Sequence, residues 1–225
     1  MKIIAKIHND FKEKFGIPRQ SGLSGELTSR IVFEPEYRNP DALRGIEGYS
    51  HLWLIWQFSE SIREEWSPTV RPPRLGGNKR VGVFATRSPF RPNPIGLSSV
   101  KLLSVEHTQS EGTVLIVSGA DLLDGTPIYD IKPYIAYSDC HTDAVSGFAD
   151  ERLNYHLNVT FCKELLSKID VSKQKAVIQI LEQDPRPSYQ NDPDREYGMK
   201  FATYEIFFKV DGEELTVTRV EVFQT

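Results

Sequence analysis

The amino-acid sequence predicts a mainly β protein, with an N-terminal closed or nearly closed β-barrel of short strands followed by a small α+β domain. Two observations carry this prediction. Seven or more short apolar runs, separated by turn residues, precede residue 140 with almost no helical period. Beyond that point the apolar residues recur at helical spacing. We place the barrel at residues 1–145 and the second domain, with two helices and a hairpin, at 150–225.

The strands expected in the barrel are short apolar runs separated by turn-forming residues. The apolar run at 50–58 has strand length, and we expect it to be buried on both faces with His51 as a hydrogen-bonded core histidine. Asn39 as N-cap, Pro40 at the first helical position and Gly45 as stop predict one short helix. The expected strands are 3–7, 27–33, 50–58, 81–86, 97–105, 113–118 and 128–135, with 97–105 and 113–118 forming a hairpin.

The second domain is predicted from helical spacing and from one hairpin turn. Apolar residues share one helical face over 159–169, and a second helix follows with Ser172 as its N-cap. Pro185 and Pro187 end that helix because proline cannot continue one. The runs 201–210 and 215–223 then predict a hairpin on the Asp211-Gly212 turn.

Composition excludes several classes of protein. Hydrophobic residues make up 39% and charged residues 26% of the 225 residues, which is ordinary globular composition. The apolar run 52–58 is too short to span a bilayer, and we expect no signal peptide. With Cys140 and Cys162 as the two cysteines, we expect no disulfide framework and a cytoplasmic protein. Five scattered histidines predict no metal site.

Charge is distributed unevenly along the chain. The net charge is −4, yet residues 66–105 contain no Asp or Glu and carry +7. The basic residues of this segment are Arg71, Arg74, Lys79, Arg80, Arg87, Arg91 and Lys101. Such a surface on an acidic protein indicates a site for a phosphate backbone or another anion, and the plainer alternative is a solvated basic loop.

Two stretches are hard to explain by packing alone. In residues 85–97, three prolines within six residues stiffen a loop that displays Arg87, Arg91 and Asn93 between two strands. The arginines give this loop fixed forks for binding an anion. Residues 123–134 concentrate polar side chains where a turn enters a strand, although an Asp-Gly turn is common by itself.

Several motifs, taken in order, resemble the TrmO family. They are Pro18-Arg19-Gln20, Arg44-Gly45-Ile46-Glu47, Ser50-His51-Leu52-Trp53, the arm 71–80, the segment 82–88, the segment 90–96 and Asp124-Gly125-Thr126-Pro127. The segment 183–189 is similar to one in the longer, bacterial-type members. This resemblance implies a homodimeric β-barrel methyltransferase without a Rossmann fold. Its members use S-adenosylmethionine to methylate N6 of threonylcarbamoyladenosine at position 37, in the anticodon loop of tRNA.

The resemblance also implies which residues bind the cofactor, near the subunit interface. They are Pro18, Arg19, Gln20, Ser59, Glu60, Arg87, Leu97, Asp124, Gly125, Thr126 and Pro127. Some relatives carry His-Gln where this chain has Ser59-Glu60. From charge we expect Arg71, Arg74, Lys79 and Arg91 to bind tRNA. For a general base, location alone suggests Asp130, Tyr129 or Asp124.

Two other functions are compatible with these residues. One is an RNA-binding or regulatory module that holds S-adenosylmethionine without turnover. The other is a different enzyme on the same barrel, which cleaves the cofactor or alkylates a small molecule. One fold supports many functions, so only product analysis separates the three.

Overall fold

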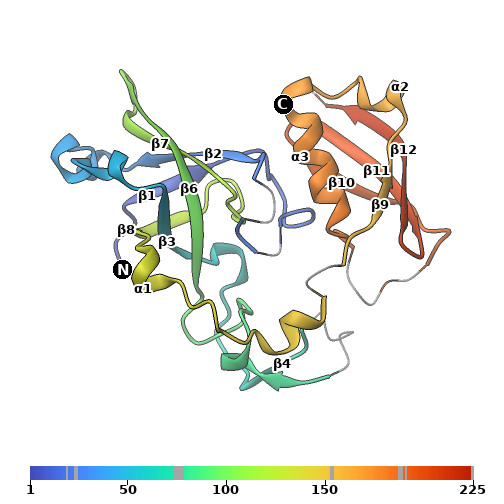
Figure 1. Ribbon diagram of the computed structural model, residues 1–225, viewed down its shortest axis with the longest axis horizontal. Coiled ribbons are helices and arrows are strands. Elements are labelled where there is room, and N and C mark those ends of the chain that lie inside the picture. The colour runs from blue at the N-terminus through green and yellow to red at the C-terminus, as the bar shows by residue number, and fades with distance from the viewer. Residues whose placement is uncertain are drawn as a thin grey trace.

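The structure is a computed structural model that describes residues 1–18, 20–22, 25–72, 79–152, 155–186, 190 and 192–223. It is mainly β, as the sequence predicts, and two large sheets lie in different halves of the chain (Figure 1). In the part of the chain that is described, no helix has the length and apolar character needed to cross a membrane.

Six antiparallel strands of the first half close into a ring. They are hydrogen-bonded in the order β1, β2, β7, β6, β3 and β8, and β8 pairs back onto β1. The strands are β1 (Ala5–His8), β2 (Thr28–Phe33), β3 (His51–Gln57), β6 (Ile95–Thr108), β7 (Gly112–Ser118) and β8 (Pro127–Pro133). The predicted hairpin of 97–105 with 113–118 is confirmed as β6 and β7.

Strand β3 is buried on one face only, so the prediction of burial on both faces is wrong. Leu52, Leu54 and Trp56 alternate into the ring's core, whereas the residues between them are partly exposed. This is the period of a sheet with one face packed on a core. His51 lies on the outer face and not in the core, where its Nδ1 lies 2.9 Å from the Ser50 hydroxyl.

The predicted strand 81–86 is mostly a turn. Strands β4 (Thr69–Val70) and β5 (Val81–Gly82) form a small separate sheet, and a 3₁₀ turn follows at Val83–Ala85. The turn forms because Thr86 donates from both its amide and its hydroxyl to the Val83 carbonyl. Further 3₁₀ turns lie at Pro35–Tyr37, Pro40–Leu43, Ile46–Gly48, Ser59–Ser61 and Gly147–Arg152. The Asn39 cap is confirmed, since its side chain accepts from the Asp41 amide at 3.0 Å.

The second sheet has four strands in the order β10, β11, β12 and β9, with β9 parallel to β12. They are β9 (Asn158–Thr160), β10 (Tyr197–Phe201), β11 (Tyr204–Asp211) and β12 (Glu214–Val222), and β11 with β12 is the predicted hairpin. The helices are α1 (Ala136–Asp139), α2 (Lys163–Leu166) and α3 (Val171–Glu182).

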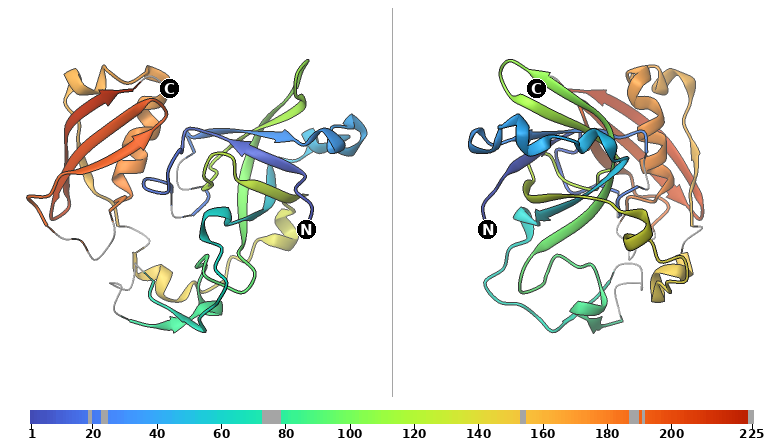
Figure 2. Two further views of the ribbon diagram at one scale, coloured as in Figure 1. Left: turned by 180° about the vertical axis from the view of Figure 1, so that it is seen from behind. Right: turned by 60° about the vertical axis from the view of Figure 1, so that its left-hand side comes forward.

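Two helix predictions in this half are corrected. The helix expected over 159–169 is wrong, because 158–160 pair with β12 and only Lys163–Leu166 are helical. The N-cap of α3 is Asp170 rather than Ser172, since the Asp170 carboxylate accepts from the Ser172 amide at 2.9 Å. Helix α3 lies on the face of the second sheet that is turned toward the ring (Figures 1 and 2).

The segment after β1 joins the two halves. Phe11 leaves the ring and is buried in the core beneath α3, with its ring centroid 5.7 Å from that of Phe201. The Asp10 carbonyl accepts from the Ala202 amide at 2.9 Å, and the Asp10 carboxylate pairs with Lys173. The ring therefore rests against the second sheet through residues close to its own first strand.

Candidate active site

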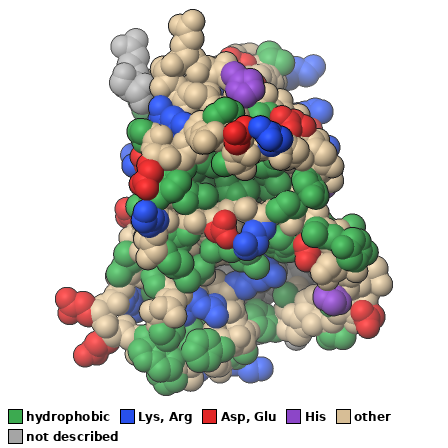
Figure 3. Space-filling model, turned by 90° about the vertical axis from the view of Figure 1, so that its left-hand side faces the viewer, with side chains coloured by type: hydrophobic (Ala, Val, Ile, Leu, Met, Phe, Trp, Pro, Cys, Tyr) green, Lys and Arg blue, Asp and Glu red, His purple; other side chains and the backbone are tan. Residues whose placement is uncertain are grey.

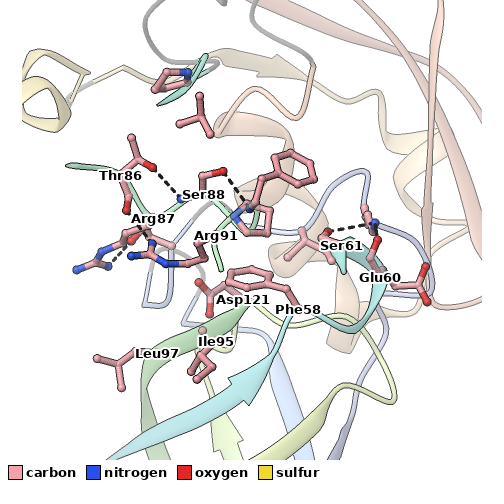
Figure 4. A pocket seen from close by; sticks show the side chains of 18 of the residues that line it. Phe58, Glu60, Ser61, Thr86, Arg87, Ser88, Arg91, Ile95, Leu97 and Asp121 are labelled. Atoms are coloured by element: carbon pink, nitrogen blue, oxygen red, sulfur yellow. Dashed lines mark hydrogen bonds between the residues drawn. The ribbon is translucent and has the colours of Figure 1, made fainter. Parts of the chain in front are cut away.

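A cavity of about 2500 Å³ lies where one end of the ring faces the second half of the chain. Its wall combines several parts of the sequence, which are the segment around Pro18, the end of β3 with residues 59–72 after it, the loop between β5 and β6, residues 121–126, residues 145–149 and the turn around Asp184. Figure 4 shows this wall at Arg87, Arg91, Asp121 and Phe58. A space of this size accommodates more than one small molecule.

The proline-containing loop is held by its own side chains. The Thr86 hydroxyl accepts from the Ser88 amide at 3.1 Å, and the Ser88 hydroxyl accepts from the Phe90 amide at 3.3 Å. The Arg91 guanidinium donates to the Thr86 carbonyl at 3.0 Å, across the turn (Figure 4). Arg91, expected to bind tRNA, therefore also fixes the loop that carries Arg87.

Arg87 and Gln20 come together at the mouth of the cavity. The Arg87 guanidinium donates to the Gln20 side-chain oxygen, although the two residues are far apart in the sequence. Arg87 is exposed, so its fork can accept an anion. Pro18 is buried beside them in the cavity wall. Arg19, the third residue of that motif, lies outside the described residues.

A buried hydrogen-bond relay ends in the cavity at Asp121. The indole N–H of Trp56 donates to the Ser98 hydroxyl at 2.9 Å, and that hydroxyl donates to Asp121 Oδ1 at 2.5 Å. Trp56 and Ser98 are 6% and 1% exposed, so the relay lies within the ring. Asp121 itself lines the cavity (Figure 4).

Burial governs the charge of Asp121. Loss of water around the carboxyl raises its pKa, against the Ser98 hydrogen bond, backbone hydrogen bonds and the positive charge of Arg87. Carboxyl groups with a raised pKa in a cavity are candidates for proton transfer. The sequence analysis missed Asp121; the signal that could have found it is a carboxylate between the apolar residues Ala120 and Leu122.

The relay is fixed by a close approach of backbone and ring. Trp56 lies against Gly96, so that a Cβ at residue 96 would fall 2.2 Å from the indole Cε2. Only glycine leaves room for the indole in this position. On its other side Trp56 contacts Phe58, with ring centroids 4.3 Å apart. Contact with Gly96 and Phe58 therefore fixes the position of the Trp56 indole. In this position its N–H can donate to the Ser98 hydroxyl.

The other residues implied for cofactor binding divide into two groups. Ser59, Glu60, Leu97 and Thr126 line the cavity, and the Glu60 carbonyl accepts from Lys14 Nζ at 2.5 Å. Leu97 is 56% exposed, whereas Thr126 is buried. The second group consists of Asp124, Gly125 and Pro127, which are close to Thr126 in the sequence, at the turn that leads into β8.

Asp124, Gly125 and Pro127 lie outside the residues that line the cavity. The Asp124 carboxylate accepts from Lys12 Nζ at 2.7 Å and from the Asn9 amide at 3.0 Å. Burial opposes ionisation of Asp124, but these hydrogen bonds outweigh it and hold the pKa of the carboxyl below its ordinary value. In this structure Asp124 joins the turn to the segment after β1.

The two residues suggested as bases on β8 are also away from the cavity wall. Asp130 Oδ1 accepts from the Ile131 amide at 2.9 Å, and Oδ2 lies 3.0 Å from Lys132 Nζ. Tyr129 is half-buried on the same strand, and neither residue lines the cavity. Of the carboxylates named so far, Asp121, Glu60 and Asp184 are the ones at the wall.

The basic arm borders the cavity. Arg71 and Arg80 are exposed and line it, and Lys79 is exposed beside them. Arg74 lies outside the described residues. Next to the arm, Trp66 and Phe84 stack with centroids 6.0 Å apart, and they are 52% and 70% exposed. Exposed aromatic rings beside basic side chains are a surface that nucleic-acid bases stack on.

The second half of the chain reaches the cavity through residues 183–186. Arg186 is 5% exposed, and its Nε lies 2.8 Å from Asp184 Oδ1. The Tyr155 hydroxyl donates to Asp184 Oδ2 at 3.1 Å. The described residues contain no group of three or more His, Cys, Asp or Glu side chains placed to hold a metal ion.

Comparison with known proteins identifies relatives of both halves of the chain. Residues 6–140 match the tRNA-methyltransferase O N-terminal domain family, and residues 154–223 match the TrmO C-terminal domain family. A tRNA (adenine(37)-N6)-methyltransferase of Escherichia coli is 39% identical over 92% of this chain and 89% of its own length. Another, from Eikenella corrodens, is 45% identical over 72% of this chain and 92% of its own length.

A solved structure resembles the whole chain. The crystal structure of TrmO from P. aeruginosa superposes with a TM-score of 0.79 at 32% identity, covering 98% of this chain and 95% of that one. The likeness therefore extends over the ring, the small sheet at the arm and the second sheet.

Proposed function

Because the chain belongs to the tRNA-methyltransferase O family, we propose that it transfers a methyl group from S-adenosylmethionine to N6 of threonylcarbamoyladenosine at position 37 of tRNA. One observation supports this function most directly. A single cavity has an arginine fork, apolar and aromatic walls, a half-buried carboxylate and a basic rim. These are the groups that a cationic donor and an RNA loop require together.

The residues at the wall fit the donor molecule. Its carboxylate suits the Arg87 fork, and its ammonium or ribose hydroxyls suit the side chain of Glu60. Its adenine and the carbon atoms beside its sulfonium suit the apolar surface that Pro18 and Leu97 supply. We propose that these residues, with Gln20, Ser59, Thr126 and the undescribed Arg19, hold the cofactor, while Asp124, Gly125 and Pro127 support the turn behind them.

The residues of this chain align the donor with its acceptor and exclude water from the reacting atoms. When bound, the cofactor supplies a methyl group on a positively charged sulfur. Phe58, Ile95 and Leu97 lie together at one side of the hollow (Figure 4), where they keep water from the reacting atoms. The stiff loop around Arg87 holds its guanidinium in one place, which lowers the entropic cost of orienting the donor.

The anticodon loop of tRNA fits the rim of the same cavity. We propose that Arg71, Arg74, Lys79 and Arg91 meet its phosphates and that Trp66 and Phe84 stack on unpaired bases. A single-stranded loop presents its base without duplex opening. Since residues 183–186 line the cavity too, the C-terminal domain completes this surface. We propose that this modification of tRNA takes place in the cytoplasm.

The exposed apolar surface supports a homodimer. Leu103 is 46% and Tyr137 is 92% exposed, and both belong to the first half of the chain. Hydrophobic side chains are spread over the face seen in Figure 3, with charged ones among them. Apolar surface of this kind marks protein interfaces. In this proposal the ring of strands is the β-barrel domain, residues 1–145, and residues 150–225 are the small α+β domain.

Nucleoside mass spectrometry tests the proposed reaction. Purified protein is mixed with S-adenosylmethionine and tRNA that carries threonylcarbamoyladenosine, and the digested nucleosides are analysed. We expect a singly methylated product, which disappears in Arg87→Ala. Arg44→Ala serves as the control, because Arg44 is an exposed arginine that pairs with Asp41. Thermal stabilisation by the cofactor without any methylated nucleoside would instead indicate a binding module.

A further inference from the structure

Asp121 is a half-buried carboxyl group at the cavity wall that the proposed cofactor and tRNA contacts do not use. Its partner Ser98 has one hydroxyl proton, and the Ser98 oxygen already accepts from the Trp56 indole. The proton of Ser98 therefore goes to Asp121, because an indole N–H cannot accept. The direction of the relay is fixed, and it ends on an oxygen acceptor at the cavity wall.

The groups that face this carboxyl come from four parts of the chain. Ser98 is on β6 and Trp56 on β3, a backbone hydrogen bond joins it to Ser21, and Arg87 acts on it by charge. Among the described residues Arg87 supplies the one ionised side chain whose charge is felt at Asp121. The net effect of burial and these partners is a pKa above the ordinary value for aspartate.

We propose that Asp121 accepts the proton lost from N6 of the adenosine during methyl transfer, and that Ser98 and Trp56 position it for this role. The inference rests on the proposed function. A nitrogen–carbon bond forms as the donor's carbon–sulfur bond breaks, and the electron pair of the broken bond stays on sulfur. The N6 proton passes to the carboxylate and then to water, so the methylated nitrogen is left neutral.

Both the chemistry and the site favour a carboxylate here. The N6 nitrogen of threonylcarbamoyladenosine belongs to a urea-type group, so it gives up its proton as the new bond forms. A base works best when its pKa approaches the working pH, and burial moves Asp121 in that direction. Asp130, Tyr129 and Asp124 do not line the cavity, which leaves them less well placed for the transfer.

The first test separates proton transfer from cofactor binding. Asp121→Asn keeps the shape but removes the acceptor charge, so the single-turnover rate of methylation should fall by roughly 10²- to 10⁴-fold. Calorimetric affinity for S-adenosylhomocysteine should stay within about threefold, as expected when only the chemical step is affected. Equal losses of binding and rate would show that Asp121 holds the cofactor, and an unchanged rate would show that it takes no proton.

A matched control is available in the other half of the chain. Asp170 also accepts from a serine hydroxyl, that of Ser172 at 2.8 Å, but it caps α3 and does not line the cavity. Asp170→Asn should methylate at the rate of the unaltered protein. Asp121→Glu, which retains a carboxylate, should recover part of the rate that Asp121→Asn loses. Failure of the whole proposed function would leave every variant, and the unaltered protein, without product.

The positioning role is tested in the free protein by a titration. Carbon-13 NMR of the aspartate carboxyl carbons, with the Asp121 signal assigned by its loss in Asp121→Asn, should give a midpoint above that of ordinary aspartate. Ser98→Ala removes a donor to the anion, so both this midpoint and the acid limb of the pH–rate profile should move to higher pH. An ordinary midpoint, or a midpoint that Ser98→Ala leaves in place, would overturn the positioning role.

Discussion

At the scale of single residues, Asp121 lies in surroundings that disfavour its ionised form and raise its pKa. The sequence predicted Arg87 at the site, because prolines stiffen a loop around it. It did not predict Asp121, whose chemistry depends on partners that the fold brings near. Ser98 is 23 positions away from Asp121, and Trp56 is 42 positions away from Ser98. No local sequence pattern predicts contacts between residues so far apart, because only the register of β3 on β6 brings Trp56 beside Ser98.

The raised pKa of Asp121 predicts how the thermal stability of the protein depends on pH. A carboxyl whose folded pKa lies above its unfolded value destabilises the fold at neutral pH, and that loss is recovered as pH falls through the folded pKa. Asp121→Asn should therefore raise the melting temperature at pH 7.5, and the gain should fade toward pH 4. Differential scanning calorimetry across this range measures it.

Asp170→Asn again provides the comparison. Its hydrogen bonds to the Ser172 backbone and side chain lower the pKa of Asp170, so the sign of its effect is reversed. Asparagine also caps helices well, and we expect no gain in melting temperature from this change. A loss of stability in Asp121→Asn at pH 7.5 would mean that the carboxylate is favourably solvated in the fold.

At the scale of elements, the sequence predicted the six strands of the ring and failed on several short elements elsewhere. Strands β6 and β7 are long apolar runs on either side of a turn, so the sequence showed their hairpin. Strand β9 has 3 residues and forms only by pairing with β12, which no local period can show. Residues 83–85 have strand-forming side chains, but hydrogen bonds from Thr86 to the Val83 carbonyl turn them into a 3₁₀ helix.

The basic arm gives the prediction at this scale. Reversing charge at Arg71 and Lys79 together should weaken tRNA binding strongly at low salt and less at high salt. The logarithm of the tRNA binding constant falls linearly with the logarithm of the salt concentration. Each lost phosphate contact makes this negative slope shallower by roughly 0.7 to 0.9. Fluorescence anisotropy with labelled tRNA at several salt concentrations measures the slope.

The arm variant needs a charge control and a cofactor measurement. Lys209→Glu reverses one positive charge on β11, in the second sheet and away from the cavity, and should leave the slope nearly unchanged. Calorimetric affinity for S-adenosylhomocysteine should persist in the arm variant. Parallel losses of tRNA and cofactor binding would show that the arm completes the cofactor pocket instead.

At the scale of the whole molecule, the two halves share a core through Phe11. This residue follows β1 of the ring but is 2% exposed among side chains of α3 and the second sheet. Gly16, a little further along, has φ of +91° and lies so near Met199 that a Cβ would fall 2.5 Å from its sulfur. The boundary predicted near residue 150 describes the order of the sheets, but the contact between them uses residues 10–16.

Truncating Phe11 should therefore affect both halves. Phe11→Ala removes a fully buried aromatic ring, which costs about 3–5 kcal/mol of the free energy of unfolding. All three tryptophans, Trp53, Trp56 and Trp66, precede residue 70, so fluorescence reports the first half and far-ultraviolet circular dichroism reports both. Urea midpoints from the two probes should fall together. Phe11→Leu, a milder change, should cost about 1.5 kcal/mol or less.

The position of Phe11 has a consequence for synthesis on the ribosome. Phe11 and Leu27 leave the exit tunnel early, but the strands that cover them, β10 to β12, are made last. At translation speeds of about 5–20 residues per second, that interval is on the order of ten to forty seconds. Throughout it the nascent chain exposes apolar side chains that α3 and the final strands bury together. A chain released before these strands are made would thus keep this apolar surface exposed and would tend to aggregate. Full-length translation is therefore a condition for the solubility of the protein.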